Sequence, residues 1–234
     1  MNPSTLTDAQ IDANTEVVRL DLVPEIPVRL LSLESDWSQI DCGPFVNEVF
    51  PYWLFAWGAG QAMARYLLDN PQSVSGKVIC DIGTGCGLAA IAAAKSGAAR
   101  VIATDVDPNA LSSCTQNARL NDVSVTCVNT SGIPSEHIDL VLASDLFFHW
   151  PENVSLLDAR TTPCDALVAA PDRRAYPLDE PIHASLLNCL KKYDTRTVPS
   201  IERADIRTVS VYSRPGRAPE GESQHDANDH GRMQ

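Results

Sequence analysis

The sequence lacks two features that would place the protein in a membrane or outside a reducing compartment. No stretch approaches the roughly 18 to 20 consecutive apolar residues of a bilayer-spanning helix. The first 16 residues are polar and acidic, which predicts neither a secretory signal nor an arginine-rich transit peptide. The seven cysteines include no C-x-x-C pair, so their spacing indicates neither a zinc site nor a disulfide framework. These absences predict a cytoplasmic protein with no bound metal and no membrane partner.

Basic residues are also scarce. The chain has 18 Lys and Arg against 30 Asp and Glu, which gives a formal net charge of -12. Such a charge repels a polyanion, so binding to nucleic acid is disfavoured. A basic protein or a neutral small molecule is the partner that this charge favours.

The chain is long enough for one large domain, since 234 residues with 44% hydrophobic content can bury a real core. Residues 1–50 mix helix-like and extended stretches with several prolines, which predicts an N-terminal extension packed on the main domain. We assign the main domain to residues 51–213. Residues 214–234 hold proline, glycine and charge with almost no large apolar residue, which predicts a disordered tail.

From Gly76 onward, short β-rich apolar runs alternate with helix-like runs. This alternation predicts βαβ units and a doubly wound, Rossmann-like α/β fold. Helices are expected over 88–96, ending before Gly97, and over 108–120, with Asp107 as N-cap. Strands are expected over 77–80, 101–104, 123–128, 138–143 and 166–169, and two late runs, 195–198 and 208–211, would complete a seven-stranded sheet.

A glycine-rich turn follows the first strand of this domain. Gly83, Gly85 and Gly87 allow a tight turn into the next helix and the close approach of a ligand to the backbone. Asp81 places a carboxylate beside the helix N-terminus, which suits the cationic amino acid moiety of S-adenosylmethionine better than a pyrophosphate. Asp105 ends the second strand about 20 residues later, where a ribose diol is usually bound. The residues predicted to bind the cofactor are therefore Asp81, Gly83, Gly85, Gly87 and Asp105.

The turn alone leaves a second interpretation open. Residues 85–90 also satisfy the G-x-G-x-x-A pattern of dinucleotide-binding folds, so a nicotinamide oxidoreductase is the competing reading. A third interpretation is a turn that only packs a helix on the sheet and binds no ligand. Asp81 and the roughly 75 residues that precede the first strand favour a methyltransferase.

The fourth strand ends at Asp145-Leu146-Phe147-Phe148, where open α/β sheets bind their ligands. A lysine amine must lose a proton before it can accept a methyl group. Asp145 is the candidate catalytic residue because its carboxylate can hold the ammonium, and Phe147 and Phe148 can contact the cation and exclude water. A helix N-cap followed by two core phenylalanines is the alternative.

More specific motifs lie in the first half of the chain. They are N-T-E at 14–16, the run at 22–26, P-Y-W-L-F-A-W at 51–57, G-Q-A-M-A-R-Y-L-L-D-N-P at 60–71, the glycine segment at 81–98 and T-D-V-D-P-N-A-L at 104–111. Over roughly residues 14–150 they resemble the electron transfer flavoprotein beta-subunit lysine methyltransferase family, a branch of the seven-strand class I methyltransferases. The resemblance implies S-adenosylmethionine as cofactor and a protein lysine as acceptor.

The resemblance also implies roles for single residues. The family motif D-x-x-[FY] corresponds here to Asp145 and Phe148, with Asp145 facing the target lysine. Trp53 falls on the acceptor side, although the apolar run around it could also form a buried lid. The cofactor pocket would be lined by Trp57, Gly83, Gly85, Asp105 and Ser144, with Asn129 near the adenine.

Two segments depart from the family pattern. The chain reads W-G-A-G-Q at 57–61 where the family has W-P-G-G-Q, and A-P-D-R-R at 170–174 where it has G-D-P-G-R. Loops after the fourth and fifth strands shape the acceptor side, so an N-methyltransferase of a small nicotinamide-like amine and a non-catalytic S-adenosylmethionine-binding protein are the alternatives. A nucleic-acid methyltransferase is disfavoured, because the fourth strand does not end in N-P-P-Y and no basic stripe is present.

Overall fold

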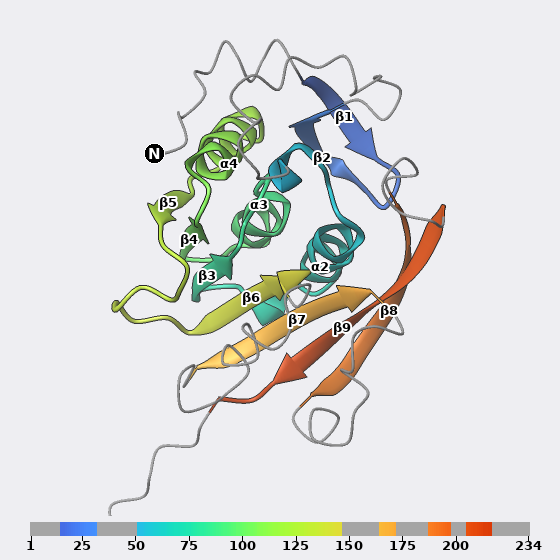
Figure 1. The fold of residues 1–234 in the computed structure, drawn as a ribbon. Helices are drawn as coiled ribbons and strands as arrows, with labels where there is room; N and C mark the ends of the chain where they lie inside the picture. Colours follow the sequence, from blue (N-terminus) through green and yellow to red (C-terminus); the bar gives the residue numbers. More distant parts are fainter. Residues whose placement is uncertain (1–14, 32–50, 147–163, 172–186, 198–204, 217–234) are drawn as a thin grey trace, which may run out of the picture.

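A seven-stranded sheet forms the centre of the molecule, in the strand order β5-β4-β3-β6-β7-β9-β8. The computed structural model describes residues 15–31, 51–146, 164–171, 187–197 and 205–216. Figure 1 shows the sheet, whose strands are β3 (Val78–Ile82), β4 (Arg100–Asp105), β5 (Thr126–Asn129), β6 (Leu140–Ser144), β7 (Asp165–Pro171), β8 (Asn188–Arg196) and β9 (Ile206–Arg214). The predicted Rossmann-like, seven-stranded α/β fold is confirmed.

The first five strands of the sheet are parallel, and the last two form an antiparallel hairpin beside β7. The chain proceeds outward from β3 to β4 and β5, then returns to place β6 against the other side of β3. This reversal between β3 and β6 is the topological switch point of a doubly wound sheet, the place where such folds bind ligands.

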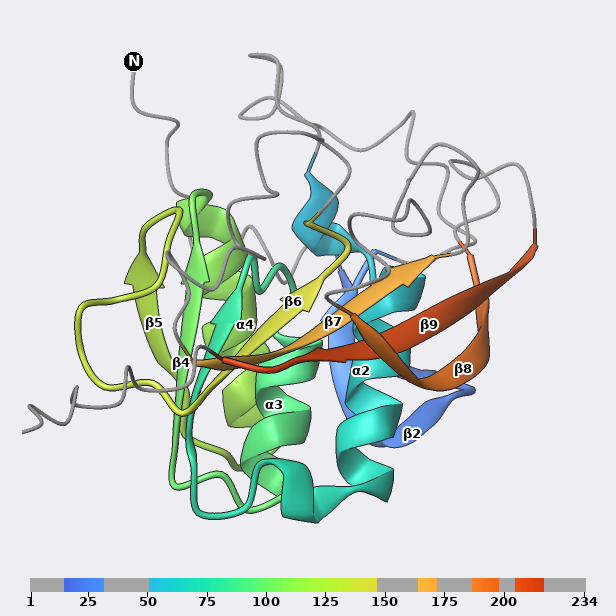
Figure 2. The same ribbon diagram turned by 90° about the horizontal axis from the view of Figure 1, so that it is seen from below.

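The described α-helices α2 (Gly58–Asp69), α3 (Leu88–Lys95) and α4 (Pro108–Leu120) lie on the same side of the sheet, as Figure 2 shows. Two short 3-10 helices, η3 (Tyr52–Leu54) and η4 (Pro71–Ser73), flank α2. Every residue of α3 from Leu88 to Ala93 is buried, which fits a helix that is apolar all round. The predicted N-cap of α4 is confirmed, because the Asp107 side chain accepts a hydrogen bond from the Asn109 amide at 2.8 Å.

The predicted strands β5 and β8 depart most from the structure, while the other predicted strands overlap it with shifted ends. β5 begins at Thr126 and not at 123, because Asp122 has a φ of 55° and the Val123 amide donates to the Ala118 carbonyl. These residues still belong to the C-terminal turn of α4. β8 covers Asn188–Arg196, whereas a strand was expected over 195–198. Most of β8 is exposed at an edge of the sheet, so its sequence has no apolar alternation to reveal it.

The described part of the first fifty residues is an antiparallel hairpin of β1 (Glu16–Leu20) and β2 (Val23–Leu30). Val23, Ile26 and Val28 on β2 are fully buried. α4 and its C-cap also bind this hairpin: Asn117 Oδ1 accepts from the Arg29 amide at 2.7 Å, and Nδ2 of the C-cap Asn121 donates to the Pro27 carbonyl at 2.7 Å. The hairpin therefore shares the core of the main sheet. The tail expected to be disordered lies, from residue 217, outside the described residues.

Candidate functional site

The glycine turn between β3 and α3 has all three predicted glycines in the left-handed region, at φ of 62°, 54° and 85°. A Cβ on Gly83 would lie 2.3 Å from Leu146 Cδ2, and a Cβ on Gly87 would lie 2.7 Å from Cys114 Sγ and 3.0 Å from Cys114 Cα. Gly85 differs, because its nearest neighbour would be the Trp53 Cα at 4.0 Å. A Cβ at Gly87 would meet the backbone of Cys114, whereas a Cβ at Gly83 would meet only the flexible end of Leu146. Among the described residues, the backbone at Gly85 is open to a ligand.

Asp81 is buried at the end of β3, directly before the turn, with 2% of its surface exposed. Burial raises the pKa of this carboxyl to about 7, while the hydroxyl of Thr84 and the backbone N–H of Ala90 oppose the shift. Thr84 Oγ1 donates to Asp81 Oδ2 at 2.7 Å. A cationic group beside this carboxyl would favour its ionised form.

Asp105 joins the end of β4 to the glycine turn. Its Oδ2 accepts from the Gly85 amide at 3.0 Å, and its Oδ1 accepts from the Asp107 amide at 3.0 Å. Burial raises the pKa of Asp105, and these amide hydrogen bonds oppose the rise. Asn129, at the end of β5, donates from Nδ2 to the carbonyls of Asp105 and Val106 at 3.0 and 3.1 Å. The turn after β4 is thus held from both sides.

The end of β6 lies against the glycine turn across the switch point. The buried Ser144 Oγ has no hydrogen-bond partner within the described ranges. Asp145 has a φ of 58°, which is uncommon for a residue other than glycine, and its amide donates to the Ala169 carbonyl at 3.1 Å. Leu146 packs on Gly83. The candidates Phe147 and Phe148 lie outside the described residues.

The two candidate tryptophans have different surroundings. Trp53 lies in η3 with 2% of its surface exposed, and its backbone faces Gly85. Trp57 is partly exposed before α2, where its Nε1 donates to the Tyr52 carbonyl at 2.8 Å. Its ring lies 5.9 Å from that of Tyr52 and 5.8 Å from that of Phe55. The structure therefore brings Trp53, expected on the acceptor side, next to the cofactor turn.

Three residues of the site were missed from the sequence. Thr84 holds Asp81, and only its place between two glycines could have indicated this role. Leu146 covers Gly83, a contact that no sequence pattern shows. Gln61 donates from Nε2 to the carbonyls of Ala56 and Arg196 at 2.7 and 3.3 Å, so it connects the tryptophan segment to the end of β8.

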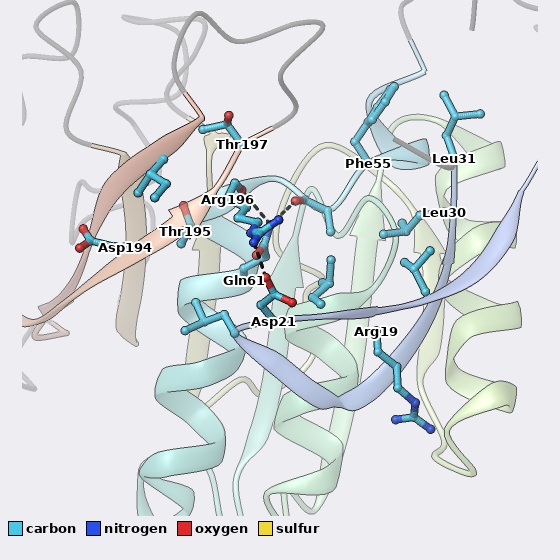
Figure 3. A pocket seen from close by; sticks show the side chains of 15 residues that line it. Arg19, Asp21, Leu30, Leu31, Phe55, Gln61, Asp194, Thr195, Arg196 and Thr197 are labelled. Atoms are coloured by element: carbon cyan, nitrogen blue, oxygen red, sulfur yellow. Dashed lines mark hydrogen bonds and ion pairs between the residues drawn. The ribbon is translucent and has the colours of Figure 1, made fainter. Parts of the chain in front are cut away.

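A cavity of about 460 Å³ lies between the β1–β2 hairpin and the end of β8 (Figure 3). Its lining is mostly apolar, with Gln61 at its wall and an ion pair between Asp21 and Arg196 at 2.9 Å. Phe55 and Ala56 also line it, yet none of the predicted site residues does. The predicted residues that converge on the glycine turn therefore do not line this cavity, although Gln61 does.

Within the described ranges, no three His, Cys, Asp or Glu side chains lie close enough together to hold a metal ion. None of the described helices is long and apolar enough to cross a membrane. Cys86, inside the glycine turn, is buried, and burial raises the pKa of its thiol to about 11, which fits a small filler better than a reactive group.

Comparison with known sequences gives two kinds of match. A family model described as Ribosomal protein L11 methyltransferase (PrmA) matches residues 56–147. The electron transfer flavoprotein beta subunit lysine methyltransferase of Mus musculus is 41% identical over 146 residues, which cover 60% of this chain and 56% of that protein. The Homo sapiens protein of the same name is 42% identical over 146 residues, 60% of this chain and 55% of that protein. The chain thus matches little more than half the length of these relatives.

Solved structures agree on the fold. Magnesium protoporphyrin IX methyltransferase from Synechocystis PCC 6803, with bound SAM, has a TM-score of 0.51 at 19% identity, covering 67% of this chain and 80% of that chain. The 16S rRNA N2 G1207 methyltransferase from T. thermophilus has a TM-score of 0.52 at 14% identity, covering 87% of this chain and 50% of that chain. The comparisons confirm the class I methyltransferase fold and the resemblance of this chain to the electron transfer flavoprotein beta subunit lysine methyltransferases.

Proposed function

We propose that this protein transfers a methyl group from S-adenosylmethionine to a lysine side chain of another protein. One observation carries the proposal: the glycine turn, Asp105 and Asp145 converge at the switch point between β3 and β6. The identity of 41% over 146 residues to lysine methyltransferases supports the same activity.

The residues at the switch point fit this cofactor. Within the described residues, a Cβ on Gly85 would meet nothing closer than 4.0 Å, and the Asp105 carboxylate beside it can accept a further hydrogen bond from a ribose hydroxyl. Ser144 Oγ is a buried hydroxyl still without a described partner. Asp81 would favour a cationic amino acid moiety, while Trp57 and Asn129 would flank the adenosine. S-adenosylmethionine, when bound, supplies an electrophilic methyl group on a sulfonium.

Asp145 is the residue that would act on the acceptor. Asp145 follows the carboxyl end of β6 and has a left-handed backbone conformation. Residues held in such conformations cluster at functional sites. The Asp145 carboxylate would hold the lysine ammonium while Nζ loses a proton, and would then stabilise the positive charge that develops on Nζ during transfer. Trp53, Phe147 and Phe148 would exclude water around the amine.

The acceptor that we propose is a lysine on a basic protein surface. The formal net charge of -12 favours encounter with such a surface. The names of the relatives make the electron transfer flavoprotein beta subunit the first protein to test. On the sequence grounds given above, we also propose a cytoplasmic location.

The decisive experiment is a parallel calorimetric titration with S-adenosylmethionine, S-adenosylhomocysteine and NADH. We expect micromolar binding of both sulfur ligands, abolished by Asp105→Ala. Asp165→Ala is the matched control, because Asp165 lies at the amino end of β7, away from the carboxyl ends of the parallel strands where the glycine turn lies. Binding of NADH alone would overturn the proposal. Transfer of a radiolabelled methyl group to the flavoprotein subunit, lost on replacing its lysines, would then identify the acceptor.

A further inference from the structure

The cavity between the β1–β2 hairpin and the end of β8 is large enough to receive part of another molecule (Figure 3). Its volume of about 460 Å³ falls in the range that is usual for binding pockets. Leu30, Leu31 and Phe55 are buried in its wall, whereas Ile206, which also lines it, has 62% of its surface exposed. An apolar group that entered the cavity would be removed from water and would also cover Ile206.

The cavity lies at the same end of the sheet as the candidate catalytic residue. β6, β7 and β8 run in one direction, because β6 is parallel to β7 and β9 is antiparallel to both β7 and β8. Ser144 therefore ends β6, and Arg196 ends β8, at the same end of the sheet. Ile206 begins β9 there and pairs with Arg196. Since Asp145 directly follows Ser144, the cavity and this carboxylate are at one end of the molecule.

One short segment separates the cavity from the glycine turn. Phe55 and Ala56 line the cavity, and Trp53, two residues earlier, has its backbone toward Gly85. The segment is held on the cavity side, because Gln61 Nε2 donates to the Ala56 carbonyl at 2.7 Å. A partner that fills the cavity is thus one segment away from the turn.

The charged groups of the lining favour a neutral apolar occupant over an anionic one. Arg196 Nε forms an ion pair with Asp21 Oδ2 at 2.9 Å. Arg19 Nη1 donates to the Pro24 carbonyl at 2.6 Å and points away from the cavity in Figure 3. Among the described lining residues, no cation is left for an anionic ligand. Asp194 on β8 is exposed, and its carboxylate suits a basic residue beside the inserted group.

We propose that this cavity is the docking site for the acceptor protein, which inserts a large apolar side chain into it while its lysine lies at Asp145. This assignment rests on the proposed function, since the lysine is its substrate. The partner surface that fits is an exposed apolar side chain flanked by basic residues, which agrees with the formal net charge of -12. Buried apolar anchors supply much of the affinity between proteins, and binding at a second place orients the reacting lysine. The protein would thus select its acceptor by a folded surface as well as by a lysine.

The test compares Ile206→Asp with the wild type in the full chain. The acceptors are the intact electron transfer flavoprotein beta subunit and a short peptide around its methylated lysine. We expect KM for the intact subunit to rise about tenfold in the variant, with kcat and the S-adenosylmethionine Kd unchanged. KM for the peptide should stay the same, because a short peptide lacks the folded surface. Leu120→Asp is the matched control, since it adds the same charge at an apolar residue of α4 that is 39% exposed and lies outside the cavity lining.

A cross-link identifies directly what occupies the cavity. With p-benzoylphenylalanine at position 206, illumination should attach the chain to the flavoprotein subunit. The same group at position 120 should not. Mass spectrometry of the linked peptides should then show that the attached residue of the subunit is a large apolar one or its immediate neighbour.

Three outcomes overturn the proposal. The first is an unchanged KM for the intact subunit in Ile206→Asp, and the second is an equal rise in Leu120→Asp. The third is a cross-link from position 206 only to the same chain or to a second copy of it. Absence of methyl transfer by the wild type to any lysine would instead refute the proposed function, and the cross-link would still decide whether the cavity binds the flavoprotein subunit.

Discussion

The two sides of the switch point are built differently. On the β3–β4 side, each candidate carboxylate accepts hydrogen bonds from nearby groups: Asp81 from Thr84, and Asp105 from Gly85 and Asp107. On the β6 side, the shape depends on distant contacts, such as Leu146 on Gly83. The cofactor half is thus specified largely by short motifs, and the acceptor half by tertiary packing. This difference explains why the sequence indicates the cofactor more firmly than the acceptor.

Substitution within the turn should give the largest effect. Gly87→Ala adds a Cβ against Cys114 at a φ of 85°, so we expect a loss of about 3 kcal/mol in the free energy of unfolding, measured by urea denaturation. Gly85→Ala has open space and should cost only about 1 to 2 kcal/mol from its backbone conformation, yet remove cofactor binding. Equal losses of stability would show that the two glycines do not differ in role.

Asp145→Asn tests the acceptor half alone. Asparagine tolerates the left-handed backbone, so the fold should persist, while kcat for lysine methylation falls about 100-fold and the cofactor Kd stays the same. The control is Asp122→Asn, the same change at the other described non-glycine residue with positive φ, after α4. Unchanged kcat in Asp145→Asn would remove this carboxylate from the mechanism.

The buried Asp81 predicts a pH dependence of stability. Its pKa is raised from 3.8 to about 7, so the folded state binds more protons than the unfolded state between these values. The contribution of this carboxyl to stability is present below pH 4 and is lost as pH rises to 7. We expect Asp81→Asn to remove most of this decline in the free energy of unfolding. A decline of the same size in the variant would assign it to other groups.

The smallest effect is expected for Gln61, whose side chain connects the tryptophan segment to the end of β8. Gln61→Leu leaves the Ala56 and Arg196 carbonyls without this donor, so we expect a loss of about 1 kcal/mol in thermal denaturation. KM for the acceptor should rise more than the cofactor Kd, because the end of β8 lies far from Asp105 in the order of the sheet. Gln72→Leu, at an exposed position, is the control. A change in the cofactor Kd larger than the change in the acceptor KM would contradict the assignment of Gln61 to the acceptor side.

The sequence predicted the ends of helices α3 and α4 more accurately than the bounds of the strands at the edges of the sheet. Asp107 and Pro108 start α4, and Gly97 ends the turn after α3 with a φ of 89°, because capping is a local property of the chain. β8 was misplaced because an exposed edge strand carries no apolar alternation. α2 was recognised only as a family motif, and its helical structure was not predicted.

By itself, the sequence determined the fold class, the glycine turn and the acids at the ends of β3 and β4, since these depend on periodicity and on spacing within short segments. Only the tertiary structure decided that Trp53 faces Gly85, that Leu146 packs on Gly83, and that Cys114 packs on Gly87. Each of these contacts joins elements that are separate along the chain. Their geometry follows from how helices and strands pack, and no local pattern of residues encodes it.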